Sequence, residues 1–131
     1  MCWPDLIFVA EDLQKQKIVG YVLAKIDDED ESELKQKKGH ITSLSVLRDY
    51  RRLGIAKDLM EATHLAMKSI FDLEIVTLHV RETNASAMGL YRDTLKYEIL
   101  KVDKEYYADN EDAYLMQKKL DKIFPESVKL D

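Results

Sequence analysis

The stretch RDYRRLGIAKDLM, Arg48 to Met60, brings a glycine and four basic side chains to the point where an apolar pattern with helical spacing begins. The pattern continues to Ile70, and its apolar and polar residues fall on different sides of a helix. The expected apolar side carries Ile55, Leu59, Ala62 and Ala66, and the expected polar side carries Lys57, Glu61, His64 and Lys68. The sequence therefore predicts a helix that starts directly after Gly54.

This helix start is a candidate anion site. A helix N-terminus presents unbonded N–H groups with a partial positive charge, and a glycine there lets a ligand approach the backbone. Arg48, Arg51 and Arg52 add positive charge, so a diphosphate would fit. The chain has neither GxxxxGK before Ser or Thr nor GxGxxG after a strand, so it gives no support to a P-loop triphosphatase or a Rossmann dehydrogenase. A glycine turn with solvated arginines explains the stretch equally well.

Three strands are expected before this helix. Residues 6–11 and 17–26 are rich in β-branched and aromatic residues, and the polar segment between them suits a hairpin turn. Residues 39–46 are expected to form the third strand. The segment from Asp27 to Lys38 is too charged to bury, and we interpret it as a solvated loop that is either a plain connection or a binding segment.

A strand, a helix and a hairpin are expected after it. The apolar run 74–80 is typical of a strand covered on both faces. Asn84 is a good N-cap for a second helix that extends to about Leu95. Residues 97–107 and 112–120 are expected to close the fold as an antiparallel hairpin. The resulting order, β-β-β-α-β-α-β-β, predicts an α/β (α+β) protein with a mixed sheet.

Length, composition and charge limit the classes of function. The chain has 131 residues, of which 46% are hydrophobic, so one domain spanning 1–131 is expected, with 121–131 as a flexible tail. A net charge of -5 argues against direct nucleic-acid binding. The single cysteine, Cys2, fits a reducing compartment, and the sequence contains neither a signal peptide nor an apolar run of about 20 residues. We therefore expect a cytoplasmic protein without a membrane anchor.

A family resemblance extends over nearly the whole chain, from Trp3 to about Leu120. RRLGIA, at residues 51–56, matches the (Q/R)xxGx(G/A) motif of the Gcn5-related N-acetyltransferases (GNAT). WPDLIFVAED, IVGYVLAK, GHITSLSV, LHVRETN and EYYADNEDAYLM occur in the order seen in catalytic subunits of the N-terminal acetyltransferase A (NatA) complex. The resemblance implies the GNAT fold, in which a mostly antiparallel sheet has a splayed strand pair and flanking helices.

The resemblance also implies acetyl-coenzyme A as the cosubstrate. In this family the loop backbone holds the diphosphate, and a strand of the splayed pair bonds pantetheine through its free backbone groups. On this chain the implied cofactor-binding residues are Leu44, Ser45, Val46, Arg51, Arg52, Leu53, Gly54, Ile55, Ala56, Lys57, Asn84 and Tyr91. For Asn84, a role as helix cap is equally well supported and is compatible with cofactor contact. No His, Asp or Glu cluster has metal-ligand spacing, so no metal is expected.

Three catalytic residues are implied. An α-amine with a pKa of about 7.7–8.0 is mostly protonated near pH 7, so acetyl transfer requires a base, and the oxyanion that forms requires an N–H donor. His79 resembles the family's histidine base, although it is equally interpreted as a buried structural histidine. Tyr91 resembles the family's tyrosine near the coenzyme A sulfur, and the alternative is that it is an aromatic residue of the core. The backbone N–H near Leu44 is the candidate oxyanion donor.

The peptide side is expected at the closing hairpin. Family members hold the substrate N-terminus there, and Tyr106 and Tyr107 lie at its tip. If both belong to a strand they point to opposite faces, so at most one packs in the core. His40, at the start of the third strand, is either a substrate-lining residue or a polar strand end. We assign no role to His64, and Trp3 and Pro4 are expected to serve packing.

The resulting hypothesis is a NatA-type N-α-acetyltransferase that acts on protein N-termini or nascent chains, with a large helical auxiliary subunit at the ribosome. The alternatives are an acetyltransferase for another amine, such as a lysine side chain, and a noncatalytic acetyl-coenzyme A-binding module. Family members carry a strand and two helices before the WP segment, which this chain lacks. We therefore expect exposed apolar surface near Trp3, Ile7 and Val9, and self-association through the uncovered strand edge.

Overall fold

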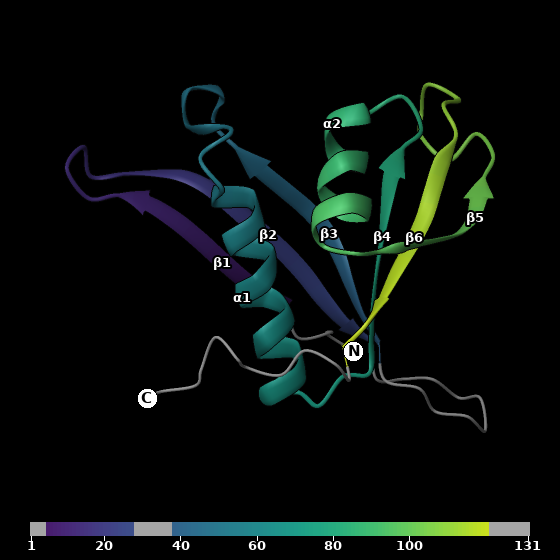
Figure 1. Cartoon of the computed structure of the whole chain (residues 1–131), viewed down its shortest axis with the longest axis horizontal. Coiled ribbons are helices and arrows are strands. Elements are labelled where there is room, and N and C mark those ends of the chain that lie inside the picture. The colour runs from purple at the N-terminus through teal and green to yellow at the C-terminus, as the bar shows by residue number, and fades with distance from the viewer. Residues whose placement is uncertain (1–4, 28–37, 121–131) are drawn as a thin grey trace. The chain divides into compact units, whose positions relative to one another are not determined.

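The structure, a computed structural model, describes residues 5–27 and 38–120 (Figure 1). The expectations for Cys2, Trp3, Pro4, most of the charged loop and the tail 121–131 fall outside the described residues. The chain divides into two compact units, one formed by the residues up to Val76 together with those from Lys119 onward, the other by Thr77–Lys118. The expectation of a single domain stays a prediction.

The first unit is a three-stranded antiparallel sheet with one long helix. Its strands are β1 (Asp5–Asp12), β2 (Lys17–Asp27) and β3 (Lys38–Val46), in the order β1-β2-β3. Helix α1 (Ile55–Ser69) packs on all three strands (Figure 1). Gly20 permits this approach, because a Cβ there would lie 3.2 Å from the Ser45 carbonyl oxygen and 3.3 Å from Leu59 Cδ1. The three predicted strands and the helix are confirmed.

Helix α1 buries a side that agrees only in part with the predicted one, since Leu59 and Ala66 are buried as predicted. Its buried residues are Leu59, Met60, Thr63, His64, Ala66 and Met67. His64, expected on the polar side, is 1% exposed, because it lies on the same stripe as Met60 and Met67. Ile55 and Ala62, expected on the apolar side, are only half-buried. The sequence signal failed because polar residues such as Thr63 can enter the core when they are bonded, here through its hydroxyl to the Leu59 carbonyl at 2.8 Å.

The edge strand β1 presents apolar side chains to solvent. Ile7 and Val9 are 59% and 53% exposed, as expected. They alternate with the half-buried Phe8, which faces Val22 of β2 in the strand register. Self-association through this edge stays a prediction.

The second unit contains most of β4 (Ile75–Arg81), then α2 (Ala85–Met88), η2 (Gly89–Thr94), β5 (Glu98–Asp103) and β6 (Ala113–Lys119), with strand order β4-β6-β5. β5 and β6 form the expected antiparallel hairpin. Four apolar side chains of β4 are buried, namely Ile75, Val76, Leu78 and Val80. The predicted mixed α/β class is confirmed by the elements of the two units.

The predicted second helix has two parts. The Asn84 side chain caps α2 by accepting the Ala87 N–H at 3.1 Å, which confirms the predicted cap. From Gly89 the chain continues as a π-helix, in which the Leu95 N–H donates to the Leu90 carbonyl five residues earlier. Glycine is a poor residue for a helix interior, and the change of helix type occurs at this position.

The hairpin tip is a loop rather than strand. β5 ends at Asp103, so Tyr106 and Tyr107 lie in the connection 104–112, hereafter the hairpin loop, and the expectation of strand alternation for the two tyrosines is wrong. Asp112 Oδ1 accepts the Glu105 N–H at 2.8 Å, and Asp109 Oδ1 accepts the Glu111 N–H at 3.1 Å. Aspartates that bond nearby backbone amides favour turns over strand pairing. Within the described part of the chain, no helix is long and apolar enough to cross a membrane.

Candidate active site

The predicted site residues fall into two groups, one in each unit. In the first unit, the loop Arg51–Gly54, hereafter the RRLG loop, leads into α1. Gly54 is the N-cap residue, and its φ of 83° and ψ of 7° lie in the left-handed region that favours glycine. No side chain caps the helix, and a Cβ at Gly54 would meet nothing within 4 Å. The first-turn N–H groups of Ile55, Ala56 and Lys57 are therefore left without a side-chain cap, as an anion site requires.

The side chains of this loop mostly face solvent. Arg51, Arg52 and Leu53 are exposed, and Lys57 pairs with Glu61 at 3.2 Å across one helical turn. Arg51 Nε donates to the Val46 carbonyl at 3.0 Å, which ties the loop to the end of β3. The two arginine side chains are thus exposed at the start of α1, and Arg51 also ties the loop to β3.

Tyr50, immediately before the RRLG loop, makes a contact that sequence reasoning missed. Its hydroxyl donates to Asp12 Oδ2 at 2.6 Å, and Lys17 Nζ lies 5.5 Å from its ring centroid. This hydrogen bond is the largest cause of the lowered pKa of Asp12 and of the raised pKa of Tyr50. The contact joins the short helix η1 (Arg48–Tyr50) to the β1–β2 turn, and no local sequence signal links these two segments.

The predicted cofactor-binding residues of β3 are paired with β2 in the strand register. Leu44 and Ser45 face Val22 and Tyr21 of β2, and Val46 faces Gly20. Leu44 is half-buried, Ser45 is exposed and Val46 is buried. His40 is half-buried at the other end of β3, opposite Lys25.

In the second unit, β4 presents His79 and Arg81 on one face, because residues two apart on a strand share a face. His79 Nε2 lies 2.9 Å from Asp103 Oδ2, and the ring stacks on Tyr106 with centroids 4.0 Å apart and planes 14° apart. The hydrogen bond from His79 is the largest cause of the lowered pKa of Asp103. The predicted base and one predicted substrate-binding tyrosine are therefore in direct contact.

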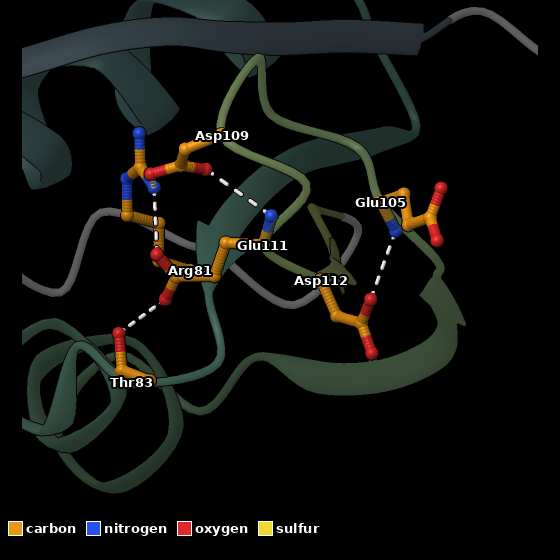
Figure 2. Close-up of polar contacts among 6 residues, drawn as sticks. All are labelled: Arg81, Thr83, Glu105, Asp109, Glu111 and Asp112. Carbon is orange, nitrogen blue, oxygen red and sulfur yellow. Dashed lines mark hydrogen bonds and ion pairs between the residues drawn. The ribbon is translucent and has the colours of Figure 1, made fainter.

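Arg81 contacts one part of the hairpin loop (Figure 2). Its Nη1 contacts Glu111 Oε2 at 2.7 Å and Asp109 Oδ2 at 2.8 Å, and its guanidinium carbon lies 4.0 Å from the Tyr107 ring centroid. The Thr83 hydroxyl donates to the other Glu111 oxygen. We call Arg81, Thr83, Tyr107, Asp109 and Glu111 the Arg81 cluster.

The charges of this cluster support one another. Bonds from Thr83 and Arg81 lower the pKa of Glu111, and a backbone bond and Arg81 lower the pKa of Asp109. The two carboxylates in turn raise the pKa of Arg81. Tyr107 also packs edge-on against Tyr106, with centroids 5.0 Å apart. The cluster thus connects to the His79 group through the two tyrosines.

Tyr91 lies in the π-helical segment η2 and is 8% exposed. Burial raises its pKa to about 12, so the phenol keeps its proton at neutral pH. Its ring lies 5.9 Å from that of Tyr97. Single-turn π segments are frequent at functional sites, which is consistent with either of the roles considered for this residue.

Sequence reasoning missed Arg81, Asp103, Asp109 and Glu111. All except Asp103 belong to LHVRETN or EYYADNEDAYLM, which were recognised only as family patterns. An arginine on a strand and acidic residues in a distant loop carry no pairing signal until the hairpin folds onto β4. Among residues 5–27 and 38–120, no group of three His, Cys, Asp or Glu side chains is placed to hold a metal ion.

Comparisons with known proteins identify the family of this chain. The model of the acetyltransferase (GNAT) family matches residues 2–97. The N-terminal acetyltransferase complex ARD1 subunit homolog of Dictyostelium discoideum is 50% identical over 88% of this chain and 54% of its own length. The N-terminal acetyltransferase A complex catalytic subunit NAA10 of Arabidopsis thaliana is 50% identical over 92% of this chain and 60% of its own length. The chain thus spans between half and two thirds of these relatives.

Solved structures share the fold. The crystal structure of Chaetomium thermophilum Naa20 in complex with a bisubstrate analogue is 34% identical, with a TM-score of 0.75 over 85% of this chain and 64% of that chain. That of Arabidopsis thaliana NAA60 in complex with acetyl-CoA is 26% identical, with a TM-score of 0.72 over 84% of this chain and 70% of that chain.

Proposed function

Because the chain belongs to the acetyltransferase (GNAT) family, we propose that it transfers acetyl from acetyl-coenzyme A to the α-amine of protein N-termini. The observation that carries the proposal is 50% identity to a NatA catalytic subunit over 92% of the chain. We further propose that it acts as the catalytic subunit of a NatA-type complex, with a large helical auxiliary subunit, in the cytoplasm and on nascent chains at the ribosome.

The RRLG loop would bind the diphosphate of the cosubstrate. Support comes from the uncapped start of α1 and from the open space beside Gly54, which together leave backbone N–H groups for an anion. Arg51 and Arg52 would add attraction at longer range. The backbone of Leu44, Ser45 and Val46 would pair with pantetheine, and Asn84 would contact the cofactor arm while it caps α2.

Acetyl transfer would then use three groups. His79, with Asp103 beside it, would take the proton that the α-amine loses as its nitrogen attacks the acetyl carbonyl. The backbone N–H near Leu44 would stabilise the oxyanion. The buried phenol of Tyr91 would donate to the leaving thiolate. Tyr106, Tyr107 and His40 would line the peptide path.

The role of Tyr91 is better described as hydrogen-bond donation than as full proton transfer. A free thiol has a pKa of about 8.5, whereas burial raises the pKa of Tyr91 to about 12. Complete transfer of the phenol proton to a thiolate would therefore be uphill, on the order of 5 kcal/mol. A donated hydrogen bond stabilises the thiolate without that cost.

The test is an acetylation assay on short peptides with varied first residues. We expect α-amine acetylation of peptides that start with small residues, and strong stimulation by a NatA-type auxiliary subunit. A peptide with a blocked α-amine and a free lysine distinguishes acetylation of a lysine side chain from acetylation of an α-amine. If only that peptide were acetylated, the proposal would be contradicted. Tight acetyl-coenzyme A binding without turnover, in the presence of the auxiliary subunit, would indicate the noncatalytic module instead.

A further inference from the structure

Asp103 was not among the residues predicted from sequence to belong to the site. It ends β5, and its Oδ2 atom lies 2.9 Å from Nε2 of His79 on β4. Both side chains are mostly shielded, with 17% exposure for His79 and 26% for Asp103. On the ring face, Tyr106 of the hairpin loop stacks at 4.0 Å. One nitrogen and one face of the imidazole are thus held by groups of the hairpin.

The neighbouring carboxylates have other contacts. Asp109 and Glu111 bond Arg81, and Asp112 bonds Lys104 and the Glu105 N–H. The second oxygen of Asp103 lies 3.4 Å from Lys101 Nζ, an exposed amine on the same strand. Lys101 balances the charge of Asp103 without competing for the oxygen that faces His79.

The contact fixes where the ring carries its proton. A carboxylate only accepts hydrogen bonds, so a neutral imidazole in contact with it must have its proton on the nearer nitrogen. That nitrogen is Nε2, which leaves the lone pair on Nδ1. The same logic operates wherever an aspartate orients a catalytic histidine: it selects the tautomer and stabilises the imidazolium that forms.

We propose that Asp103 is a positioning residue that holds His79 in the Nε2–H tautomer, so that Nδ1 is the proton acceptor of the acetyl-transfer reaction. This inference rests on the proposed function of His79 as base. The proton that leaves the amine nitrogen adds to Nδ1, while the Nε2 proton stays on the ring and faces the carboxylate. Nδ1 is buried in the peptide-free chain, so the amine would reach it through a local rearrangement or through one bridging water.

The arrangement couples peptide binding to proton transfer. Tyr106 is a proposed substrate-binding residue, and it is 49% exposed although its ring covers His79. A peptide that contacts Tyr106 therefore contacts the ring that stacks on His79, the proposed base. Asp103 itself is placed to act through His79 rather than on the peptide.

The first experiment is independent of activity. Nitrogen-15 NMR of the imidazole, with His79 signals assigned by their loss in His79→Gln, reports which nitrogen carries the proton. In the wild-type chain we expect the Nε2–H tautomer. Asp103→Asn should shift the ring toward the Nδ1–H tautomer, because the side-chain amide can donate to Nε2, while Asp103→Glu should keep the original tautomer. A wild-type ring protonated on Nδ1 alone, or on both nitrogens near pH 7.5, would overturn the proposal.

The second experiment uses turnover on a peptide substrate, with the auxiliary subunit present. Asp103→Asn should lower kcat by roughly 10²-fold, the range of a lost general base, with KM for acetyl-coenzyme A unchanged. Asp103→Glu should restore much of the rate. Asp93→Asn, the same substitution at an exposed aspartate that pairs with Arg92, is the matched control and should behave as wild type.

The outcomes separate this inference from the proposed function. If the wild-type chain acetylates no amine but the tautomer shifts as expected, the proposed function fails and the structural role of Asp103 stands. If the wild type is active and Asp103→Asn keeps full kcat, the inference is wrong and the proposed function survives. Equal loss in the Asp103→Asn and Asp103→Glu variants, with melting temperatures well below wild type, would reduce Asp103 to a folding role and also overturn the inference.

Discussion

The RRLG loop and the hairpin loop are organised in opposite ways. The RRLG loop has exposed side chains, an uncapped helix start and a glycine at a φ of 83°. Between the hairpin loop and strands β4 and β5, by contrast, three carboxylates, an arginine, a histidine and two tyrosines contact one another through side chains. The first loop leaves backbone N–H groups without a side-chain cap, and the second is held by side-chain contacts.

The difference matches the chemistry proposed for each loop. A diphosphate is the same in every catalytic cycle, and backbone N–H groups at a helix start suffice to bind it. The peptide N-terminus varies between substrates, and its amine must lose a proton. The peptide site therefore needs side chains that accept a proton and that distinguish one N-terminus from another. Substitutions in the RRLG loop should therefore act through backbone conformation. Substitutions in the second unit should act through the loss of individual side-chain groups.

The largest effect is expected from the loss of one oxygen atom in the second unit. Tyr91→Phe removes the proposed donor to the thiolate and should lower kcat by roughly 10²-fold, as loss of one transition-state donor does. Acetyl-coenzyme A affinity, measured by calorimetry, should change much less. Since the pKa of Tyr91 is about 12, no loss of activity from its ionisation is expected below about pH 11. Near wild-type turnover, in an assay limited by chemistry, would make Tyr91 a packing residue.

The next effect tests the backbone role of the RRLG loop. Gly54→Val forces a β-branched residue toward a φ of 83°, and its side chain would enter the space proposed for the diphosphate. We expect acetyl-coenzyme A affinity to fall at least tenfold, about 1.4 kcal/mol, in titration calorimetry on a folded variant.

Two controls separate strain from bulk at Gly54. Gly54→Asn, which tolerates the left-handed region, should lose less affinity than Gly54→Val. Gly89→Ala changes a glycine that has helical dihedrals and open space around its Cβ, and it should bind acetyl-coenzyme A as wild type does. Unchanged affinity in Gly54→Val would contradict the assignment of this loop.

A smaller effect is expected at Arg81, whose Nη1 contacts two carboxylates while its guanidinium lies over the Tyr107 ring. Arg81→Gln removes contacts to Asp109, Glu111 and the Tyr107 ring, so the peptide-binding side of the hairpin loop should loosen. KM for the peptide should rise several-fold while acetyl-coenzyme A affinity stays constant. Arg81→Lys should lose less than Arg81→Gln, because an ammonium can still pair with both carboxylates that meet Nη1, although it lacks the planar group that lies over the Tyr107 ring. If acetyl-coenzyme A affinity changed instead of the KM for the peptide, the assignment of the hairpin loop to peptide binding and of the RRLG loop to cosubstrate binding would be contradicted.

Much of this fold followed from local pattern. All six strands were predicted, because alternation and β-branched runs survive in the folded sheet, and Asn84 was predicted as a cap because capping is local. His64 was placed wrongly because burial depends on the partner surface, which periodicity does not contain. The Arg81 cluster depends on contacts between β4 and the hairpin loop, so no window of sequence encodes it. The exposed RRLG loop was the easier site to find, since its signal is contiguous.

Acidification should affect the hairpin loop before it affects helix α1. The pKa values of Asp103, Asp109, Glu111 and Asp112 are all lowered by contacts in the folded chain. A lowered folded-state pKa contributes stability that is present above the unfolded value, about 3.9 for Asp and 4.3 for Glu, and is lost as pH falls through the folded-state value. Hydrogen exchange should show the Glu105 and Glu111 amides losing protection below about pH 4. Simultaneous loss of protection in α1 would mean that the carboxylates act on the whole fold rather than on the loop.

The smallest effect is expected from the one strong side-chain bond beside the RRLG loop. Tyr50→Phe removes the hydroxyl that donates to Asp12 at 2.6 Å, so η1 loses its tie to the β1–β2 turn while the ring remains. Asp12 still accepts the Gln14 and Lys15 N–H groups at 3.0 and 3.2 Å, and its carboxylate is not left without bonds. The melting temperature should fall by only a few degrees, and acetyl-coenzyme A affinity should fall less than in Gly54→Val. If Tyr50→Phe instead weakened acetyl-coenzyme A binding as much as Gly54→Val, side-chain anchoring would control the RRLG loop as it does the hairpin loop, and the contrast between the two loops would be false.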